Sequence, residues 1–150
     1  MSANAVDTTV RKTVHVSCPP ARAFELFTSG IAAWWPLCTH SLGEERAVSC
    51  AFEARPGGRI YETWDDGSER EWGTVRVCEP PTLLVYDWQP NPDRPAATEV
   101  KVRFAADGAG TRVELLHRGW ERLGAEGGGV RESYESGWEV VLRGFVEAAV

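Results

Sequence analysis

The feature that most constrains the fold is one long amphipathic segment at the end of a chain otherwise built of short ones. Between about residues 130 and 149, apolar side chains recur with the period of an α-helix and form a wide stripe. The stripe consists of Val130, Tyr134, Trp138, Val141, Leu142 and Phe145. No other segment is long enough to cover a β-sheet, so we predict that this helix covers the sheet formed by the rest of the chain.

The segments before this helix alternate apolar and polar residues, which is the pattern of half-buried β-strands. Turn residues separate them, for example at residues 65–67 and 107–110. We expect one strand at residues 10–16, two short helices near residues 20–36, and then six strands between residues 48 and 117. Consecutive strands form an antiparallel meander, unlike the parallel sheet of βαβ units.

The alternation also predicts which strand residues face the helix. At the first of the six, alternate positions are Val48, Cys50, Phe52 and Ala54, which would share one strand face. On the last two, the side chains expected to point inward are Thr98, Val100, Val102 and Phe104, and then Val113, Leu115 and His117. A highly curved sheet wrapped around one helix leaves a cleft between the two. No repeat or linker marks a second domain, so residues 1–150 are expected to form a single domain.

Glycines interrupt two parts of the C-terminal region. Residues 124–129 are expected to form a flexible loop, and they do not form a phosphate cradle because no GK[ST] follows them. Gly137 lies inside the predicted helix, where glycine costs about 1 kcal/mol relative to alanine. We therefore expect another backbone to approach the helix closely at Gly137.

Composition excludes several classes of function. The formal net charge is −6, from 22 acidic and 16 basic residues, which argues against non-specific attraction to nucleic acid or anionic lipid. No stretch approaches the roughly 20 apolar residues that span a bilayer. Residues 1–12 contain no apolar signal core, so a cytoplasmic protein is expected. The cysteines Cys18, Cys38, Cys50 and Cys78 form no CxxC pair, which indicates free thiols.

Aromatic residues are the main candidates for a ligand site. The chain has seven tryptophans, each able to bury about 150–250 Å². They could line a pocket for a flat apolar molecule, or they could simply fill the core. We predict that the ligand-binding residues are Trp64, Trp72, Trp88, His117, Tyr134 and Trp138.

Candidates for catalysis and metal binding are few. His117 points inward and has an unperturbed pKa near 6.5, which suits proton transfer. No motif ties a serine or cysteine to His117, so it is a weak candidate and we assign no catalytic residue. Residues 38–40 offer Cys38 and His40 as metal ligands, but a third and fourth are missing nearby. No metal or cofactor is expected.

Two charged residues lie on strand faces that also carry large apolar side chains. If Glu62 and Arg76 are buried, they need partners, because an isolated charge in an apolar site is costly. They could pair with each other or fix the polar end of a ligand. If the strand register differs by one residue, both would instead point into solvent.

Several motifs resemble the START-like, Bet v-type helix-grip superfamily, and within it the family of activators of heat-shock-protein-90 ATPase. They are FELFTSG at 24–30, WWP at 34–36, PGGRIYE at 56–62, EWGTVRVCEPPTLLVYDW at 71–88, HRGW at 117–120 and YESGWEVVL at 134–142. The resemblance implies an α+β helix-grip fold, with about seven antiparallel strands around the C-terminal helix, and a hydrophobic ligand cavity. The co-chaperones that named the family carry a further chaperone-binding domain, so chaperone activation is not the first expectation.

The function we expect is the binding of a small, largely apolar or aromatic molecule under the C-terminal helix. One alternative is a cyclase- or hydrolase-type enzyme that uses the same cavity, with His117 as acid or base. The other is a co-chaperone-like interaction module that acts through its surface. An enzyme requires paired titratable groups in the cavity, whereas an interaction module requires an exposed patch and a filled interior. A homodimer and a chaperone contact are left open.

Overall fold

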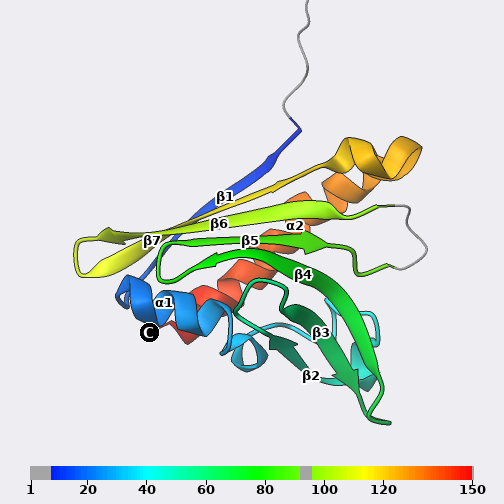
Figure 1. Ribbon diagram of the computed structural model, residues 1–150, viewed down its shortest axis with the longest axis horizontal. Helices are drawn as coiled ribbons and strands as arrows, with labels where there is room; N and C mark the ends of the chain where they lie inside the picture. The colour runs from blue at the N-terminus through cyan, green and yellow to red at the C-terminus, as the bar shows by residue number, and fades with distance from the viewer. Residues whose placement is uncertain (1–7, 92–95, 150) are drawn as a thin grey trace, which may run out of the picture.

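Seven strands form one antiparallel sheet in the computed structural model, which describes residues 8–91 and 96–149. The strand order is β1-β7-β6-β5-β4-β3-β2, so the first strand pairs with the last and the others form a meander (Figure 1). The strands are β1 (Val10–Val16), β2 (Ala47–Phe52), β3 (Arg59–Trp64), β4 (Glu69–Glu79), β5 (Leu83–Trp88), β6 (Thr98–Asp107) and β7 (Gly110–Arg118). The predicted antiparallel sheet of about seven strands is confirmed.

One long helix, α2 (Gly127–Ala148), crosses one face of this sheet (Figure 1). The two helices predicted near residues 20–36 are α1 (Pro20–Phe27) and the short 3-10 helix η1 (Ile31–Ala33). Two further 3-10 helices are η2 (Glu44–Arg46) and η3 (Trp120–Glu126). The predicted loop at residues 124–129 is therefore wrong, because η3 leads directly into α2. Gly127 is buried, and a Cβ there would lie 2.2 Å from the carbonyl oxygen of Trp120.

The core lies between α2 and the inner face of the sheet. The side chains predicted to face inward on β6 and β7 are all buried, including His117 at 0% exposure. On β2, Cys50 and Phe52 are buried, but Val48 is 60% exposed. The β2–β3 register shifts between Ala47 and Ser49, and this irregularity turns Val48 outward.

Register shifts also occur between β3 and β4 and between β4 and β5. Such bulges bend the strand that carries them and increase its twist. Figure 1 shows β4 curving along its length, so that β2 and β3 turn away from the line of the other strands. The bent part of the sheet lies near the first half of α2, where the site described below is found.

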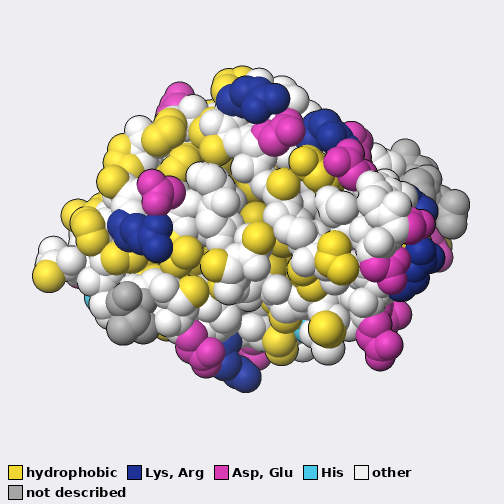
Figure 2. Space-filling view, turned by 90° about the horizontal axis from the view of Figure 1, so that it is seen from below, with side chains coloured by type: hydrophobic (Ala, Val, Ile, Leu, Met, Phe, Trp, Pro, Cys, Tyr) yellow, Lys and Arg dark blue, Asp and Glu magenta, His cyan; other side chains and the backbone are white. Residues whose placement is uncertain are grey.

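Charged side chains lie mostly around the rim of the face seen in Figure 2, where basic and acidic groups neighbour each other. Hydrophobic side chains and uncharged atoms make up the middle of that face. Among the surface ion pairs, Arg59 contacts Glu69 at 2.9 Å and Glu71 at 2.8 Å. Within residues 8–91 and 96–149, no helix is long and apolar enough to cross a bilayer.

Candidate functional site

A cavity of about 330 Å³ lies between α2 and the bent part of the sheet. Its walls come from α2, from β4 and β5, and from the segment between η1 and η2. Tryptophan and tyrosine supply five of the twelve lining residues. The rings that line the cavity belong to Trp35, Trp72, Trp88, Tyr134 and Trp138.

The four indole rings form one cluster, although they come from four different segments of the chain. The ring centre of Trp35 lies 4.9 Å from that of Trp72 and 6.2 Å from that of Trp138. Trp88 lies 5.6 Å from Trp72 and 6.5 Å from Trp138. The planes are tilted, which is a favourable arrangement for aromatic rings at these distances.

Each of these indole N–H groups is bonded to an acceptor of the protein itself. Buried indole N–H groups need such a partner, because an unpaired donor is costly in an apolar site. The bonds are Trp35 Nε1 to the His40 carbonyl oxygen at 2.8 Å, Trp72 Nε1 to Glu62 Oε1 at 2.6 Å, Trp88 Nε1 to Tyr134 Oη at 2.7 Å, and Trp138 Nε1 to His117 Nδ1 at 3.0 Å. With these donors occupied, the indoles present carbon to the cavity.

Hydrogen bonds to Glu62 on β3 hold one wall of the cavity in place. Its side chain is 0% exposed, and its two oxygens accept four hydrogen bonds. Two donors are the backbone N–H groups of Leu42 at 2.7 Å and Gly43 at 2.8 Å, and two are the indoles of Trp64 and Trp72. A carboxylate has about four acceptor positions, so all of them are taken and none remains for a ligand.

The structure separates the two charged residues that the sequence singled out. Glu62 is buried, whereas Arg76 is exposed and contacts Asp87 at 3.1 Å. Of the alternatives left open for these residues, pairing does not occur, and only Arg76 points into solvent. Burial and the negative charge of Glu62 raise the pKa of the neighbouring Cys50 thiol to about 12. Cys50 thus stays protonated and unreactive at neutral pH.

His117 lies behind the cavity wall. Burial lowers its pKa to about 3, so the imidazole is neutral at ordinary pH. Because Trp138 donates to Nδ1, the ring proton is on Nε2, which lies 2.6 Å from Thr98 Oγ1. The Thr98 hydroxyl in turn donates to the carbonyl oxygen of Trp88 at 3.2 Å. His117 therefore links two walls of the cavity, and both of its nitrogens are occupied.

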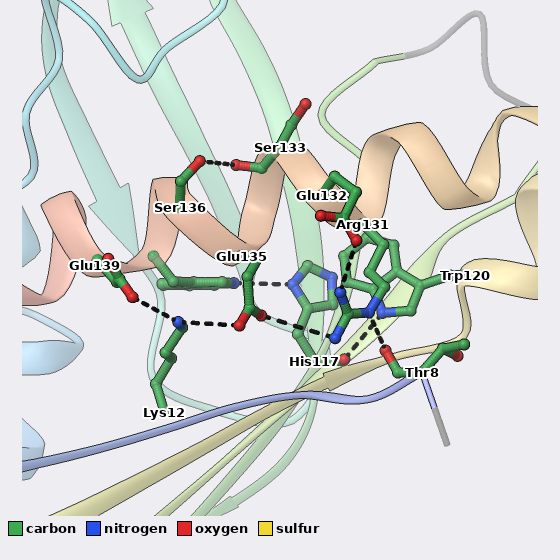
Figure 3. A network of polar contacts seen from close by, with 11 residues as sticks. Thr8, Lys12, His117, Trp120, Arg131, Glu132, Ser133, Glu135, Ser136 and Glu139 are labelled. Atoms are coloured by element: carbon green, nitrogen blue, oxygen red, sulfur yellow. Dashed lines mark hydrogen bonds and ion pairs between the residues drawn. The ribbon is translucent and has the colours of Figure 1, made fainter. Parts of the chain in front are cut away.

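Ion pairs fasten α2 to the edge strand β1 beside this core (Figure 3). Lys12 on β1 lies 3.1 Å from Glu139 and 3.5 Å from Glu135, both on α2. Arg131 donates to the carbonyl oxygen of Thr8 at 2.7 Å and lies 3.8 Å from Glu135. These contacts tie residues 131–139 of α2 to β1 and to Thr8 just before it.

Residues 17–149 match the family described as activator of Hsp90 ATPase homolog 1-like protein. The chain belongs to this family. The predicted START-like helix-grip superfamily and fold are thereby confirmed, since solved structures of similar overall shape lie in the same superfamily. Among curated proteins, no sequence matches the chain.

Three solved structures place this family member among its relatives. An anthrahydroquino-γ-pyrone synthase, Txn09, is 37% identical, with 85% of this chain and 86% of that chain covered and a TM-score of 0.59. The self-sacrificing resistance protein CalC from Micromonospora echinospora is 29% identical, with 94% and 93% covered and a TM-score of 0.71. The Aha1 dimer from Colwellia psychrerythraea, at 15% identity, 94% and 95% coverage and a TM-score of 0.69, shares the fold.

In this activator-family protein, four of the six predicted ligand-binding residues lie together. Trp72, Trp88, Tyr134 and Trp138 line the cavity. Trp64 and His117 do not line it. The ring of Trp64 lies outside, between the guanidinium groups of Arg46 at 4.7 Å and Arg70 at 4.1 Å.

The sequence did not single out Trp35, His40 or Gly137 as ligand-site residues, yet all three line the cavity. The signal for Trp35 was ambiguous, because Trp34 beside it is buried in the core and bonds the Leu26 carbonyl oxygen at 2.8 Å. His40 was considered only as a metal ligand. In the described ranges, no three His, Cys, Asp or Glu side chains gather in a way that could hold a metal ion.

Gly137 differs from its predicted role. No backbone approaches it, because the nearest atom to a Cβ built there is His40 Cδ2 at 4.0 Å. The close approach occurs instead at Gly144, where a Cβ would lie 2.7 Å from the Trp34 carbonyl oxygen. Gly137 thus leaves part of the cavity open where a larger side chain would enter it.

Proposed function

We propose that the protein binds a small, planar, largely apolar aromatic molecule in the cavity under α2. The observation that carries this proposal is the aromatic wall, in which each lining indole N–H is already bonded within the protein. A ligand placed there contacts the carbon faces of the rings and displaces water from apolar surface. A volume of about 330 Å³ is near the lower end of the range for ligand pockets, roughly 300–1,000 Å³, and suits about two to three fused rings.

The relatives support an aromatic ligand. The relative at 37% identity is described as a synthase of an anthrahydroquino-γ-pyrone, which is an aromatic ring system. Its match extends over 85% of this chain and 86% of that chain. The present chain would use the same fold to hold a molecule of that general kind.

Binding of the neutral apolar dye N-phenyl-1-naphthylamine tests the proposal. We expect a dissociation constant in the micromolar range, with a rise in dye emission and quenching of tryptophan emission. The variant Gly137→Leu should weaken binding by tenfold or more, because the new side chain projects into the cavity. Gly128→Leu is the matched control, since Gly128 is on the same helix with nothing within 4 Å of a Cβ. Both variants place leucine on α2, but only the one at Gly137 puts its side chain into the cavity.

The proposal fails if the dye does not bind the folded protein, or if Gly137→Leu and Gly128→Leu bind it equally well. His117→Gln should change the affinity by less than about tenfold, or roughly 1.4 kcal/mol, because His117 does not line the cavity. Thermal melting of each variant checks that it is folded.

A second candidate function is catalysis on such a ligand in the same cavity. The observation that favours it is the similarity to a synthase at 37% identity. Among the described lining residues, the titratable side chains are His40 and Tyr134, and no carboxylate joins them. Binding without turnover therefore remains the first proposal. Conversion of a bound aromatic by the wild-type protein, lost in a folded cavity variant, would favour the enzyme.

A further inference from the structure

His40 lies in the cavity wall between η1 and η2, and its own segment holds it in place. Its backbone N–H donates to the Pro36 carbonyl oxygen at 2.9 Å, and its carbonyl oxygen accepts the Trp35 indole N–H at 2.8 Å. On the ring, Nδ1 lies 2.7 Å from Thr39 Oγ1. One nitrogen and the backbone are thus fixed by neighbours in sequence.

The other ring nitrogen, Nε2, has no hydrogen-bond partner among the residues that the structure describes. The serines in the lining have partners of their own. Ser41 Oγ donates to the Leu37 carbonyl oxygen at 2.5 Å and accepts from Glu44 N at 2.9 Å. Ser133 Oγ donates to the Gly129 carbonyl oxygen at 3.3 Å. In a wall where the indole donors are also occupied, His40 Nε2 is a polar atom still able to bind a ligand.

The position opposite His40 leaves room for such a ligand. Cδ2 of His40 is the atom nearest to the missing Cβ of Gly137, at 4.0 Å, and Nε2 is bonded to Cδ2. The edge of the ring that carries Nε2 therefore lies on the α2 side of the cavity. Because Gly137 has no side chain, a substituent on the ligand can lie beside Nε2.

We infer that His40 selects ligands whose aromatic ring carries a hydroxyl group, with Nε2 as the hydrogen-bond partner of that hydroxyl. If Thr39 donates to Nδ1, then Nε2 carries the proton and donates. If Nδ1 donates to Thr39, then Nε2 accepts. A phenolic hydroxyl both donates and accepts, so it satisfies either tautomer. The inference rests on the proposed function, and it adds a substrate class and a specificity-determining residue to it.

The matched pair 2-naphthol and 2-methylnaphthalene isolates this contact, because the two molecules differ in one group of similar size. Each is titrated against bound N-phenyl-1-naphthylamine to obtain its affinity by displacement. In the wild-type protein we expect 2-naphthol to bind about 3- to 10-fold more tightly, which is the effect of one neutral hydrogen bond. His40→Phe keeps a ring without nitrogen, so the preference should fall to one or below, because the buried hydroxyl then lacks a partner.

The affinity of His40→Phe for 2-methylnaphthalene should stay within about twofold of wild type, which a general loss of structure would not allow. His40→Gln retains an amide near the position of Nε2 and should keep part of the preference. Ser133→Ala is the lining control and should keep all of it.

Equal affinity of the wild-type protein for the two naphthalenes would overturn the inference and leave the proposed function standing. A preference that persists in His40→Phe, or that disappears in Ser133→Ala, would also overturn it. If neither naphthalene displaces the dye because the dye itself does not bind, the proposed function fails instead. If His40→Phe does not fold, the preference for 2-naphthol is compared between His40→Gln and Ser133→Ala. A smaller preference in His40→Gln supports the inference, and a preference at least as large as that of Ser133→Ala overturns it.

Discussion

The two halves of α2 cover two different interiors. Gly144, near the end of the helix, is pressed against the backbone of Trp34, whereas Gly137, two turns earlier, faces the cavity. Around Gly144 the interior is filled by rings that touch one another. Phe145 lies 5.3 Å from Phe27 and 5.2 Å from Trp34, measured between ring centres.

The two halves are also held together in different ways. Several rings of the filled half are phenylalanines, which have no polar atom and are fixed by packing alone. Every aromatic ring that lines the cavity carries an N–H or O–H group, and each lining indole is bonded through it. A ring beside empty space lacks van der Waals contacts on that side. Hydrogen bonds to fixed acceptors therefore add to packing in holding these rings.

The strongest test of this contrast is Glu62→Gln. The substitution keeps the shape of the side chain but replaces one acceptor oxygen by an amide NH₂ group, which then faces two hydrogen-bond donors. Two of the four hydrogen bonds are lost, and buried donors are left facing each other. We expect the free energy of unfolding to fall by about 3–5 kcal/mol, measured by urea denaturation.

Glu71→Gln serves as the control for Glu62→Gln. Glu71 is exposed and contacts Arg59 on the surface, so its loss should change stability by about 0.5 kcal/mol or less. Equal effects of the two substitutions would mean that hydrogen bonding to Glu62 does not hold the cavity wall.

Lowering the pH should reduce the free energy of unfolding through His117, which is the acceptor for the Trp138 indole. Its pKa is about 3 in the folded protein and about 6.5 when unfolded, so the unfolded chain binds more protons between these values. The free energy of unfolding therefore falls as pH decreases from 6.5 toward 3, by about 1.4 kcal/mol per pH unit at full slope. Between pH 7 and 4.5 the contribution of His117 is about 2–3 kcal/mol.

The measurement is the difference in unfolding free energy between wild type and His117→Gln across this pH range. Carboxylates affect both proteins alike, so the difference isolates the histidine. His117→Gln should have the shallower pH dependence. Parallel curves for the two proteins would contradict the neutral, buried histidine described above.

The two glycines provide the smallest effects and the most direct comparison. Gly144→Ala should cost about 1–3 kcal/mol, because its Cβ would lie 2.7 Å from a backbone oxygen. Gly137→Ala should instead add about 0.5–1 kcal/mol of stability, since the Cβ meets nothing closer than 4.0 Å and alanine favours helix. Thermal melts of the two variants should shift in opposite directions. A shift of the same sign would remove the distinction between the halves.

Much of the fold could be predicted because strand and helix periods are properties of neighbouring residues. Alternation identified the inward side chains of β6 and β7, including His117, and the helical stripe identified Trp138, Val141, Leu142 and Phe145 as buried. Alternation failed at Val48, where a register shift inserts a residue that the sequence pattern does not mark.

The candidate site was harder to predict, because a cavity is bounded by segments that are distant in the sequence. Trp64 and Glu62 share a strand face, but Trp64 does not line the cavity. Its ring contacts the guanidinium groups of Arg46 and Arg70 instead. His117 faces inward as predicted, yet Trp138 stands between it and the cavity. Trp35 and His40 come from a segment without a period, so no pattern could place them.

The cluster of four indoles also gives the protein an optical property. Their ring centres lie 4.9–6.5 Å apart, and their planes are inclined to one another. Coupling between transition dipoles decreases with the cube of their separation and vanishes for some orientations, so this fixed, tilted set acts as one chiral chromophore. The near-ultraviolet circular dichroism of the protein therefore includes a signal from the cavity wall, while its far-ultraviolet spectrum reports largely on the sheet and helices. The cavity wall and the backbone can therefore be followed separately in one unlabelled sample.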